Sequence, residues 1–147
     1  MDLILWRHAD AEDGIPDDAR RLTAKGRRQA KKMAAWLAAR LPVDYRVMVS
    51  PAARARETAA ALTNNVAIEK AVSTAATPQG VLKAAGWPDG AGTVVVVGHQ
   101  PTLGAVAALA LTGEAAAWNI KKGAIWWIAR DADGGVQVRA VLTPAVL

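Results

Sequence analysis

Two histidines, His8 and His99, are the only imidazoles in the 147-residue chain, and each lies just beyond a short apolar run. His8 comes after Leu3–Trp6, and His99 after Val94–Val97; both runs are typical of buried β-strands. Ligands of open α/β sheets bind in the crevice beyond the carboxyl ends of the strands. A single histidine beside a strand is more often structural, but a pair placed in this way indicates function. We therefore expect both imidazoles to face one crevice, where a neutral ring can act as a nucleophile.

Three arginines are predicted to reach the same crevice from separate loops. Arg7 adjoins the first histidine, Arg20 stands before a predicted helix, and Arg54 lies in the first turn of a helix expected to begin at Ser50-Pro51. The planar guanidinium donates two parallel hydrogen bonds and stays charged, which suits phosphate. Helix N-termini at Pro51 and Pro101 would add backbone donors for an anion. The site is predicted to hold a phosphoryl group.

Such a site favours phosphoryl transfer, which depends mainly on positioning and on neutralising charge that spreads over the phosphoryl oxygens. Arginines can supply that neutralisation without Mg²⁺. The sequence has no Walker-type loop, no Gly-x-Ser-x-Gly elbow and no metal-ligand spacing. It also has no cysteine, which rules out a disulfide or a thiolate metal site. We expect a metal-independent enzyme without a cofactor.

Strands and helices alternate along the chain. Strands are predicted near residues 3–6, 46–49, 67–69, 93–97, 123–129 and 136–141, and helices near 23–40, 50–64, 78–85 and 102–111. This alternation predicts an α/β fold, a three-layer α/β/α sandwich with a mainly parallel central sheet. No linker or repeat interrupts the pattern, so residues 1–147 are expected to form a single domain.

The net charge of +5 and the pI of about 10.0 favour an anionic partner. The densest basic run, Lys25 to Lys32, is interpreted as the solvated face of an amphipathic helix. It lacks the interleaved aromatic residues of a stacking platform, so we expect no nucleic acid partner. No apolar run approaches the ~18 residues of a membrane span or the pattern of a leader, so we expect no membrane association and a cytoplasmic location.

Four ordered motifs add a family resemblance. They are the Arg-His pair within Leu3–Glu12, Arg-x-Leu-Thr-x-x-Gly within Asp17–Gly26, Ser-Pro-x-x-Arg-Ala-x-x-Thr over Ser50–Thr58, and Gly-His-x-Pro within Val97–Pro101. In this order they resemble the histidine phosphatase superfamily, which is phosphoglycerate-mutase-like, and most closely its small SixA-type phosphohistidine phosphatases. The motif region covers about two thirds of the chain, and the short length is SixA-like rather than mutase-like.

The resemblance implies a phosphoglycerate-mutase-like fold and a covalent mechanism. It implies that His8 attacks phosphorus and that water later releases phosphate from it. The phosphoryl oxygens would be held by Arg7, Arg20, Arg54 and His99. Relatives usually carry proline where this chain has Arg21, so the resemblance leaves open which of Arg20 and Arg21 contacts phosphate.

The substrate is predicted from a missing acid. Mutase-like relatives place a glutamate general acid in the region that here reads Ser73–Pro78, which contains no carboxylate. An alkoxide leaving group needs a proton from a positioned acid, whereas the imidazole of a phosphoramidate leaves more readily. We expect a phosphohistidine-bearing protein partner, such as a phosphotransfer domain. The alternatives are a small phosphoester metabolite and a nonenzymatic phosphate- or nucleic-acid-binding module. The remaining candidate acids lie in one solvated loop: Asp10, Glu12, Asp17 and Asp18.

Overall fold

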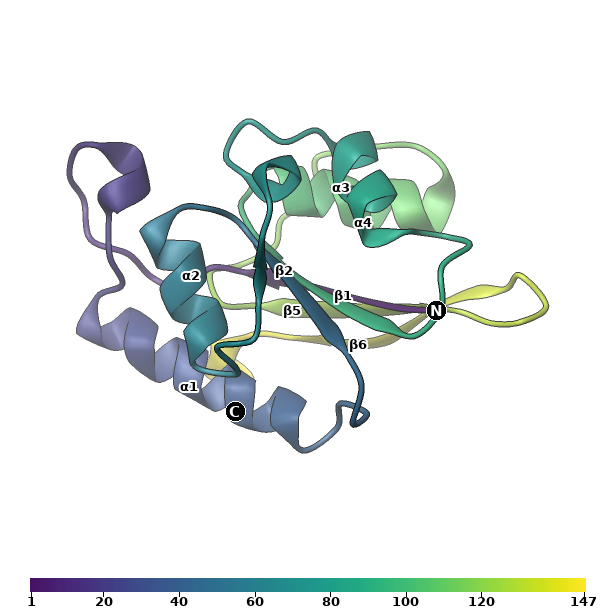
Figure 1. The fold of residues 1–147 in the computed structure, drawn as a ribbon, viewed down its shortest axis with the longest axis horizontal. Helices are drawn as coiled ribbons and strands as arrows, with labels where there is room; N and C mark the ends of the chain where they lie inside the picture. The colour runs from purple at the N-terminus through teal and green to yellow at the C-terminus, as the bar shows by residue number, and fades with distance from the viewer.

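The computed structural model describes residues 1–147 around one six-stranded sheet in the order β3-β2-β4-β1-β5-β6 (Figure 1). The strands are β1 Asp2–Arg7, β2 Arg46–Val49, β3 Ala67–Ile68, β4 Thr93–Gly98, β5 Ile125–Arg130 and β6 Val136–Leu142. Strands β1 to β4 run parallel, while β5 is antiparallel to β1 and β6 is antiparallel to β5. The predicted mainly parallel sheet is confirmed.

Helices cover both faces of this sheet, which confirms the predicted three layers. The α-helices are α1 Ala24–Ala38, α2 Ala53–Ala60, α3 Pro78–Ala85 and α4 Thr102–Thr112. Three short 3₁₀ turns are η1 Asp17–Ala19, η2 Lys70–Val72 and η3 Pro144–Val146. Helices α1 and α2 pack together on one face, and α3 and α4 pack on the other (Figure 1). None of these helices combines the length and the apolar character that crossing a bilayer requires.

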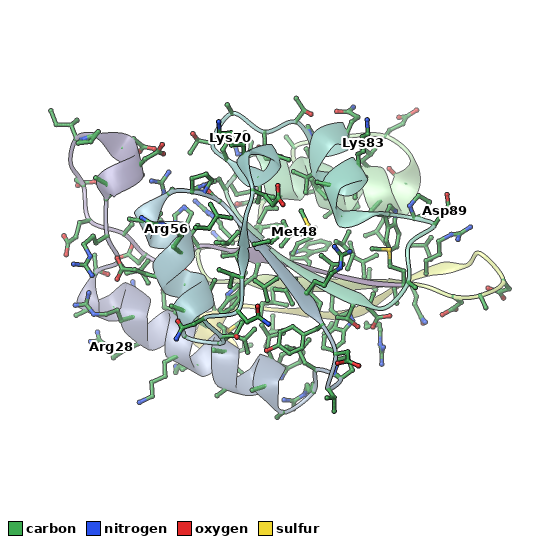
Figure 2. All side chains as sticks on the ribbon, in the orientation of Figure 1. Arg28, Met48, Arg56, Lys70, Lys83 and Asp89 are labelled. Carbon is green, nitrogen blue, oxygen red and sulfur yellow. The ribbon has the colours of Figure 1, made fainter.

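Each face of the sheet has its own hydrophobic core, because side chains alternate along a strand. Leu3 and Leu5 of β1 point into the core beneath α3 and α4. Met48 of β2, which is labelled in Figure 2, belongs to the same core. Ile4 and Trp6 point to the opposite side, into the core beneath α1 and α2. A strand buried on both faces has no solvent side, which is why β1 and β4 read as continuous apolar runs.

Of the two helix starts predicted near the site, the one at Thr23 is confirmed and the one at Ser50-Pro51 is not. Thr23 caps α1, since its Oγ1 accepts a hydrogen bond of 2.9 Å from the N–H of Gly26. The start predicted at Ser50-Pro51 is wrong, because Ala52 keeps an extended ψ of 138° and α2 begins at Ala53. The helix also ends at Ala60, earlier than the sequence pattern suggested. Ser50 instead closes a short turn, in which its Oγ accepts a hydrogen bond of 3.2 Å from the N–H of Ala52.

Candidate active site

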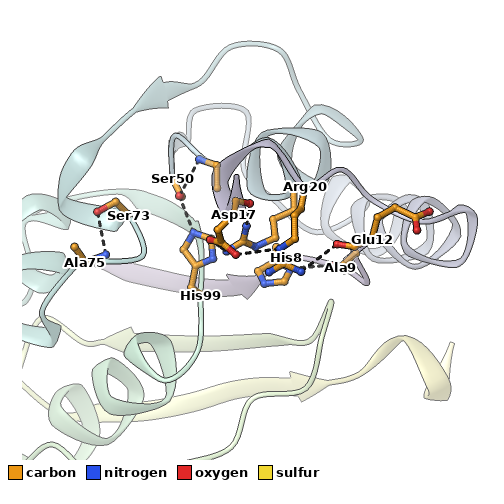
Figure 3. Close-up of polar contacts among 11 residues, drawn as sticks. His8, Ala9, Glu12, Asp17, Arg20, Ser50, Ser73, Ala75 and His99 are labelled. Carbon is orange, nitrogen blue, oxygen red and sulfur yellow. Dashed lines mark hydrogen bonds and ion pairs between the residues drawn. The ribbon is translucent and has the colours of Figure 1, made fainter. Parts of the chain in front are cut away.

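The two histidines lie side by side at one edge of the sheet. Strands β1 and β4 are adjacent and parallel, with Arg7 opposite Gly98, so the next residue of each chain segment emerges at the same level. The ring centroids of His8 and His99 are 5.3 Å apart, with the planes tilted by 55° (Figure 3). The crevice predicted from the two strand ends is therefore present.

A cavity of about 200 Å³ opens at this point. It is lined by Arg7, His8, Ala11, Arg20, Arg54, Thr74, His99, Gln100 and Lys122. All five residues that the sequence assigned to the site are among them. The lining carries four cationic side chains and no carboxylate, so the cavity favours an anion.

His8 presents a neutral ring to the cavity. Its Nδ1 lies 2.8 Å from the carbonyl oxygen of Ala9. A carbonyl only accepts, so Nδ1 must carry the proton, and Nε2 keeps a free lone pair. Burial, with smaller contributions from the neighbouring His99, Arg54 and Arg7, lowers the pKa of His8 to about 3, although the hydrogen bond to Ala9 acts in the opposite direction. A neutral imidazole with an open Nε2 is the form that can attack phosphorus.

Ser50 forms a hydrogen bond with the ring of His99. The ring Nε2 lies 2.7 Å from the Ser50 Oγ, and burial lowers the pKa of His99 to about 4 (Figure 3). Because this Oγ already accepts from Ala52, its own proton is free to be donated to Nε2. In the tautomer where Ser50 donates to Nε2, the ring proton is on Nδ1, which is buried and has no partner. His99 is thus left with one unused donor.

Arg54 is buried and anchored by one residue of the loop between β1 and α1. Its Nη1 donates to the carbonyl oxygen of Asp17 at 2.9 Å, and its Nη2 to the Asp17 carboxylate at 3.0 Å. Arg20 donates to the other oxygen of that carboxylate, also at 3.0 Å. The hydrogen bond from Arg54 contributes most to the lowered pKa of Asp17. Asp17 therefore contacts two of the arginines that line the cavity, and Figure 3 shows it beside Arg20.

Three buried side-chain nitrogen atoms in the chain have no hydrogen-bond partner: Arg7 Nε, Arg54 Nε and His99 Nδ1. All three residues line the same cavity. A buried donor without an acceptor costs about 1–3 kcal/mol. Arg7 is otherwise fixed by a 2.8 Å bond from Nη1 to the carbonyl oxygen of Ile120, and burial lowers its pKa. Unused donors from three separate residues at one cavity are what an oxyanion would satisfy.

Two motif residues connect the surrounding elements. Thr58 of α2 donates to the Arg54 carbonyl at 2.7 Å and accepts from the N–H of Ala9 at 3.0 Å, so it links the arginine to the segment after His8. Gly26 of α1 lies so close to this segment that a Cβ would stand 1.9 Å from the carbonyl oxygen of Asp10. A larger residue at position 26 would push α1 away from the site.

The structure shows which of Arg20 and Arg21 lies at the cavity, a question that the sequence left open. Arg20 lines the cavity, whereas the side chain of Arg21 is 75% exposed and pairs with Glu57 at 3.2 Å. Three lining residues were not predicted from the sequence: Thr74, Gln100 and Lys122. Thr74 and Gln100 lie inside the segments Ser73–Pro78 and Val97–Pro101, whereas Lys122 belongs to no motif.

The candidate acids of the loop after His8 either form hydrogen bonds with other side chains or lie outside the cavity. Asp10 accepts from Lys122 at 3.0 Å and from Thr23 at 2.8 Å, and these bonds lower its pKa. Asp17 is held by the two arginines, and its pKa is lowered as well. Glu12 and Asp18 are exposed and do not line the cavity. The two carboxyls whose pKa is lowered stay ionised near neutral pH and have no proton to donate.

The lowered pKa values predict that both imidazoles stay neutral in mild acid. Because the chain has two histidines, NMR should show two imidazole C2–H signals, and neither should titrate between about pH 8 and pH 5. Unfolding frees both rings to protonate at their ordinary pKa of about 6.5. Their contribution to stability is therefore complete above that pH and declines as pH falls toward 4 and then 3. A C2–H midpoint near 6.5 in the folded protein would contradict this arrangement.

Comparison with known proteins adds independent findings. Residues 3–75 match the histidine phosphatase superfamily (branch 1). An uncharacterised protein of Mycobacterium leprae is 40% identical over 107 residues, and the match covers 69% of this chain and 63% of that protein, so the chain spans less than two thirds of this relative.

Two solved structures resemble the whole chain. The protein histidine phosphatase SixA, complexed with tungstate, has a TM-score of 0.85 and 25% identity, with 99% of both chains covered. A protein assigned as phosphohistidine phosphatase SixA from Nakamurella multipartitia has a TM-score of 0.78 and 28% identity, covering 97% of this chain and 95% of that one. These matches confirm the predicted phosphoglycerate-mutase-like fold.

Proposed function

Because the chain belongs to the histidine phosphatase superfamily, as its motifs predicted, we propose that it is a phosphatase working through a covalent phosphohistidine at His8. We further propose that residues 1–147 act as one phosphatase domain and that the substrate is phosphohistidine in a protein partner. The observation that carries the proposal is the cavity itself. In it, a neutral His8 stands beside three buried nitrogen donors that lack an acceptor.

In the first step, the Nε2 lone pair of His8 attacks phosphorus. The new P–N bond forms on His8 while the P–N bond to the substrate imidazole breaks, and the departing nitrogen takes a proton from water. Negative charge on the three phosphoryl oxygens is met by Arg7, Arg54 and the Nδ1 proton of His99. The Ala9 carbonyl stabilises the positive charge that develops on His8, since it already accepts from Nδ1.

In the second step, water attacks the phosphorus bound to His8. The P–O bond forms, the P–N bond breaks, and phosphate leaves as the imidazole returns to its neutral form. The same donors serve both steps, because the charge on the phosphoryl oxygens is alike in each. The chain's own cations supply the neutralisation that this chemistry needs.

The lack of an available acid supports a phosphoramidate substrate over a phosphoester. Mutase-like relatives place a glutamate in the segment that corresponds to Ser73–Pro78, and in this chain Thr74 of that segment lines the cavity. Asp10 and Asp17 have lowered pKa values and stay ionised. A serine or sugar alkoxide would therefore leave without a proton from these carboxyls, which slows its departure. An imidazole leaving group tolerates this absence.

The proposal is tested by comparing phosphate release from a phosphohistidine peptide and from a panel of small phosphoesters, each in EDTA. We expect the peptide to be the better substrate by more than about 100-fold in kcat/KM, because general acid catalysis contributes ~10²–10⁴-fold to reactions that need it. We expect EDTA to leave both rates unchanged. A phosphoester turned over faster than the peptide would overturn the substrate assignment, and loss of all activity in EDTA would overturn the mechanism.

A further inference from the structure

A second cavity of about 600 Å³ adjoins the catalytic one and shares two of its lining residues, Arg7 and Lys122. It lies between the start of α1, the segment before β5 and the C-terminal 3₁₀ turn, which contribute Lys25, Lys121 and Pro144. We call it the lysine groove. Because Arg7 and Lys122 line both cavities, the groove lies beside the position of a phosphoryl group held at His8.

The charge of the lysine groove is strongly one-sided. Its lining contains four cations, Arg7, Lys25, Lys121 and Lys122, and one carboxylate, Asp10. That carboxylate is already bonded to Lys122 and to Thr23. Lys25 and Lys121 form no ion pair within the chain. Two exposed ammonium groups therefore remain available for anions that approach from solution.

The segment that carries these lysines is fixed to the catalytic machinery. Gln100 donates from Nε2 to the carbonyl oxygen of Trp118 at 2.8 Å, and Arg7 donates to that of Ile120 at 2.8 Å. The N–H of Gly123 donates to the carbonyl oxygen of His8 at 3.1 Å. Three bonds thus connect the segment around Lys121 to residues that line the catalytic cavity. The groove keeps a set position relative to His8.

From this arrangement we infer that the lysine groove binds carboxylate side chains that flank the phosphohistidine in the partner protein. The inference rests on the proposed function and narrows the partner to one with an acidic surface beside its phosphorylated histidine. Exposed lysines at the edge of a site steer an oppositely charged partner and affect its binding more than the chemical step. The groove should therefore act on KM and leave kcat nearly unchanged.

The test uses the full chain and two phosphohistidine peptides that differ in having glutamate or glutamine beside the phosphohistidine. Lys25→Glu and Lys121→Glu, made separately, should each raise KM for the glutamate peptide by about 3–10-fold, which corresponds to about 0.7–1.4 kcal/mol. The kcat should change less than two-fold, as should both constants for the glutamine peptide. Lys83→Glu, an equal charge change on α3 at a distance from the groove, is the matched control (Figure 2).

The possible results separate the two proposals. Equal KM effects for both peptides, or an equal effect of Lys83→Glu, would overturn the lysine groove while leaving the proposed function intact. A KM effect confined to a small phosphoester with a second anionic group would also overturn the carboxylate assignment. If the unmodified chain released no phosphate from either peptide, the proposed function itself would fail, and the groove assignment with it.

Discussion

Replacing His8 with alanine is expected to lower phosphate release by more than about 10³-fold, because removing a nucleophile removes the covalent route entirely. The arginines and His99 would remain, so inorganic phosphate should still bind. The variant should also fail to acquire protein-bound, acid-labile ³²P after brief reaction with a labelled phosphohistidine peptide. Both quantities are measured on the same preparation, with acid quenching followed by separation of protein-bound label.

His8→Ala should fold, because the imidazole lies at the cavity and its one hydrogen bond within the chain is to the Ala9 carbonyl. Such a bond contributes about 0.5–1.5 kcal/mol, a small share of the stability of a domain. Circular dichroism and phosphate binding serve as controls. A variant that retained activity within ten-fold of the unmodified chain, or that still trapped ³²P, would contradict His8 as the nucleophile.

Replacing Arg54 with alanine is the second large expected effect, a loss of about 10²–10³-fold in kcat, similar to the removal of one oxyanion donor elsewhere. Arg54 has a buried Nε that awaits an acceptor, and its two other nitrogens hold Asp17. Arg54→Ala removes the donor and also releases Asp17, which positions Arg20. The loss should therefore appear mainly in kcat.

Two further variants give that result its meaning. Arg54→Lys keeps the charge but loses the planar fork, so it should recover only part of the lost rate. Arg56→Ala removes an exposed arginine two residues further along α2 and should leave kcat within two-fold (Figure 2). Full recovery by lysine would show that charge alone suffices, and an equal loss in Arg56→Ala would show that helix α2, rather than its buried arginine, was responsible.

Much of this architecture could be predicted from the sequence because the decisive patterns are local. Apolar runs ending in His8 and His99 define two buried strands, and two parallel neighbours present their carboxyl ends at one edge. The cap at Thr23 and the helix start at Pro78 also follow from neighbouring residues. The placement of five site residues followed from the same reasoning, supported by the ordered motifs.

The parts that the sequence left undetermined depend on contacts between distant segments. Serine is a common N-cap residue, yet the hydroxyl of Ser50 contacts His99, which is 49 residues further along the sequence. Arg20 and Arg21 are adjacent, and their roles differ because Arg20 pairs with Asp17 at the cavity while Arg21 pairs with Glu57 on α2. Lys122 reaches the cavity because the segment before β5 folds back over His8. The spacing of neighbouring residues in the sequence does not indicate which distant residues will be in contact.

The central place of β1 in the sheet has a consequence for how the protein loses its activity. Strand β1 is hydrogen-bonded on both sides, to β4 and to β5, and its residues Leu3 to Trp6 are fully buried. Amides in such a strand exchange with solvent only when the whole protein unfolds, whereas loops open locally at little cost. The exposed loop that carries Arg20 can thus fluctuate while the strand that ends before His8 stays fixed. Heat or denaturant should first displace Arg20 from the cavity, while Arg7 at the end of β1 and the nucleophile should be displaced only at global unfolding.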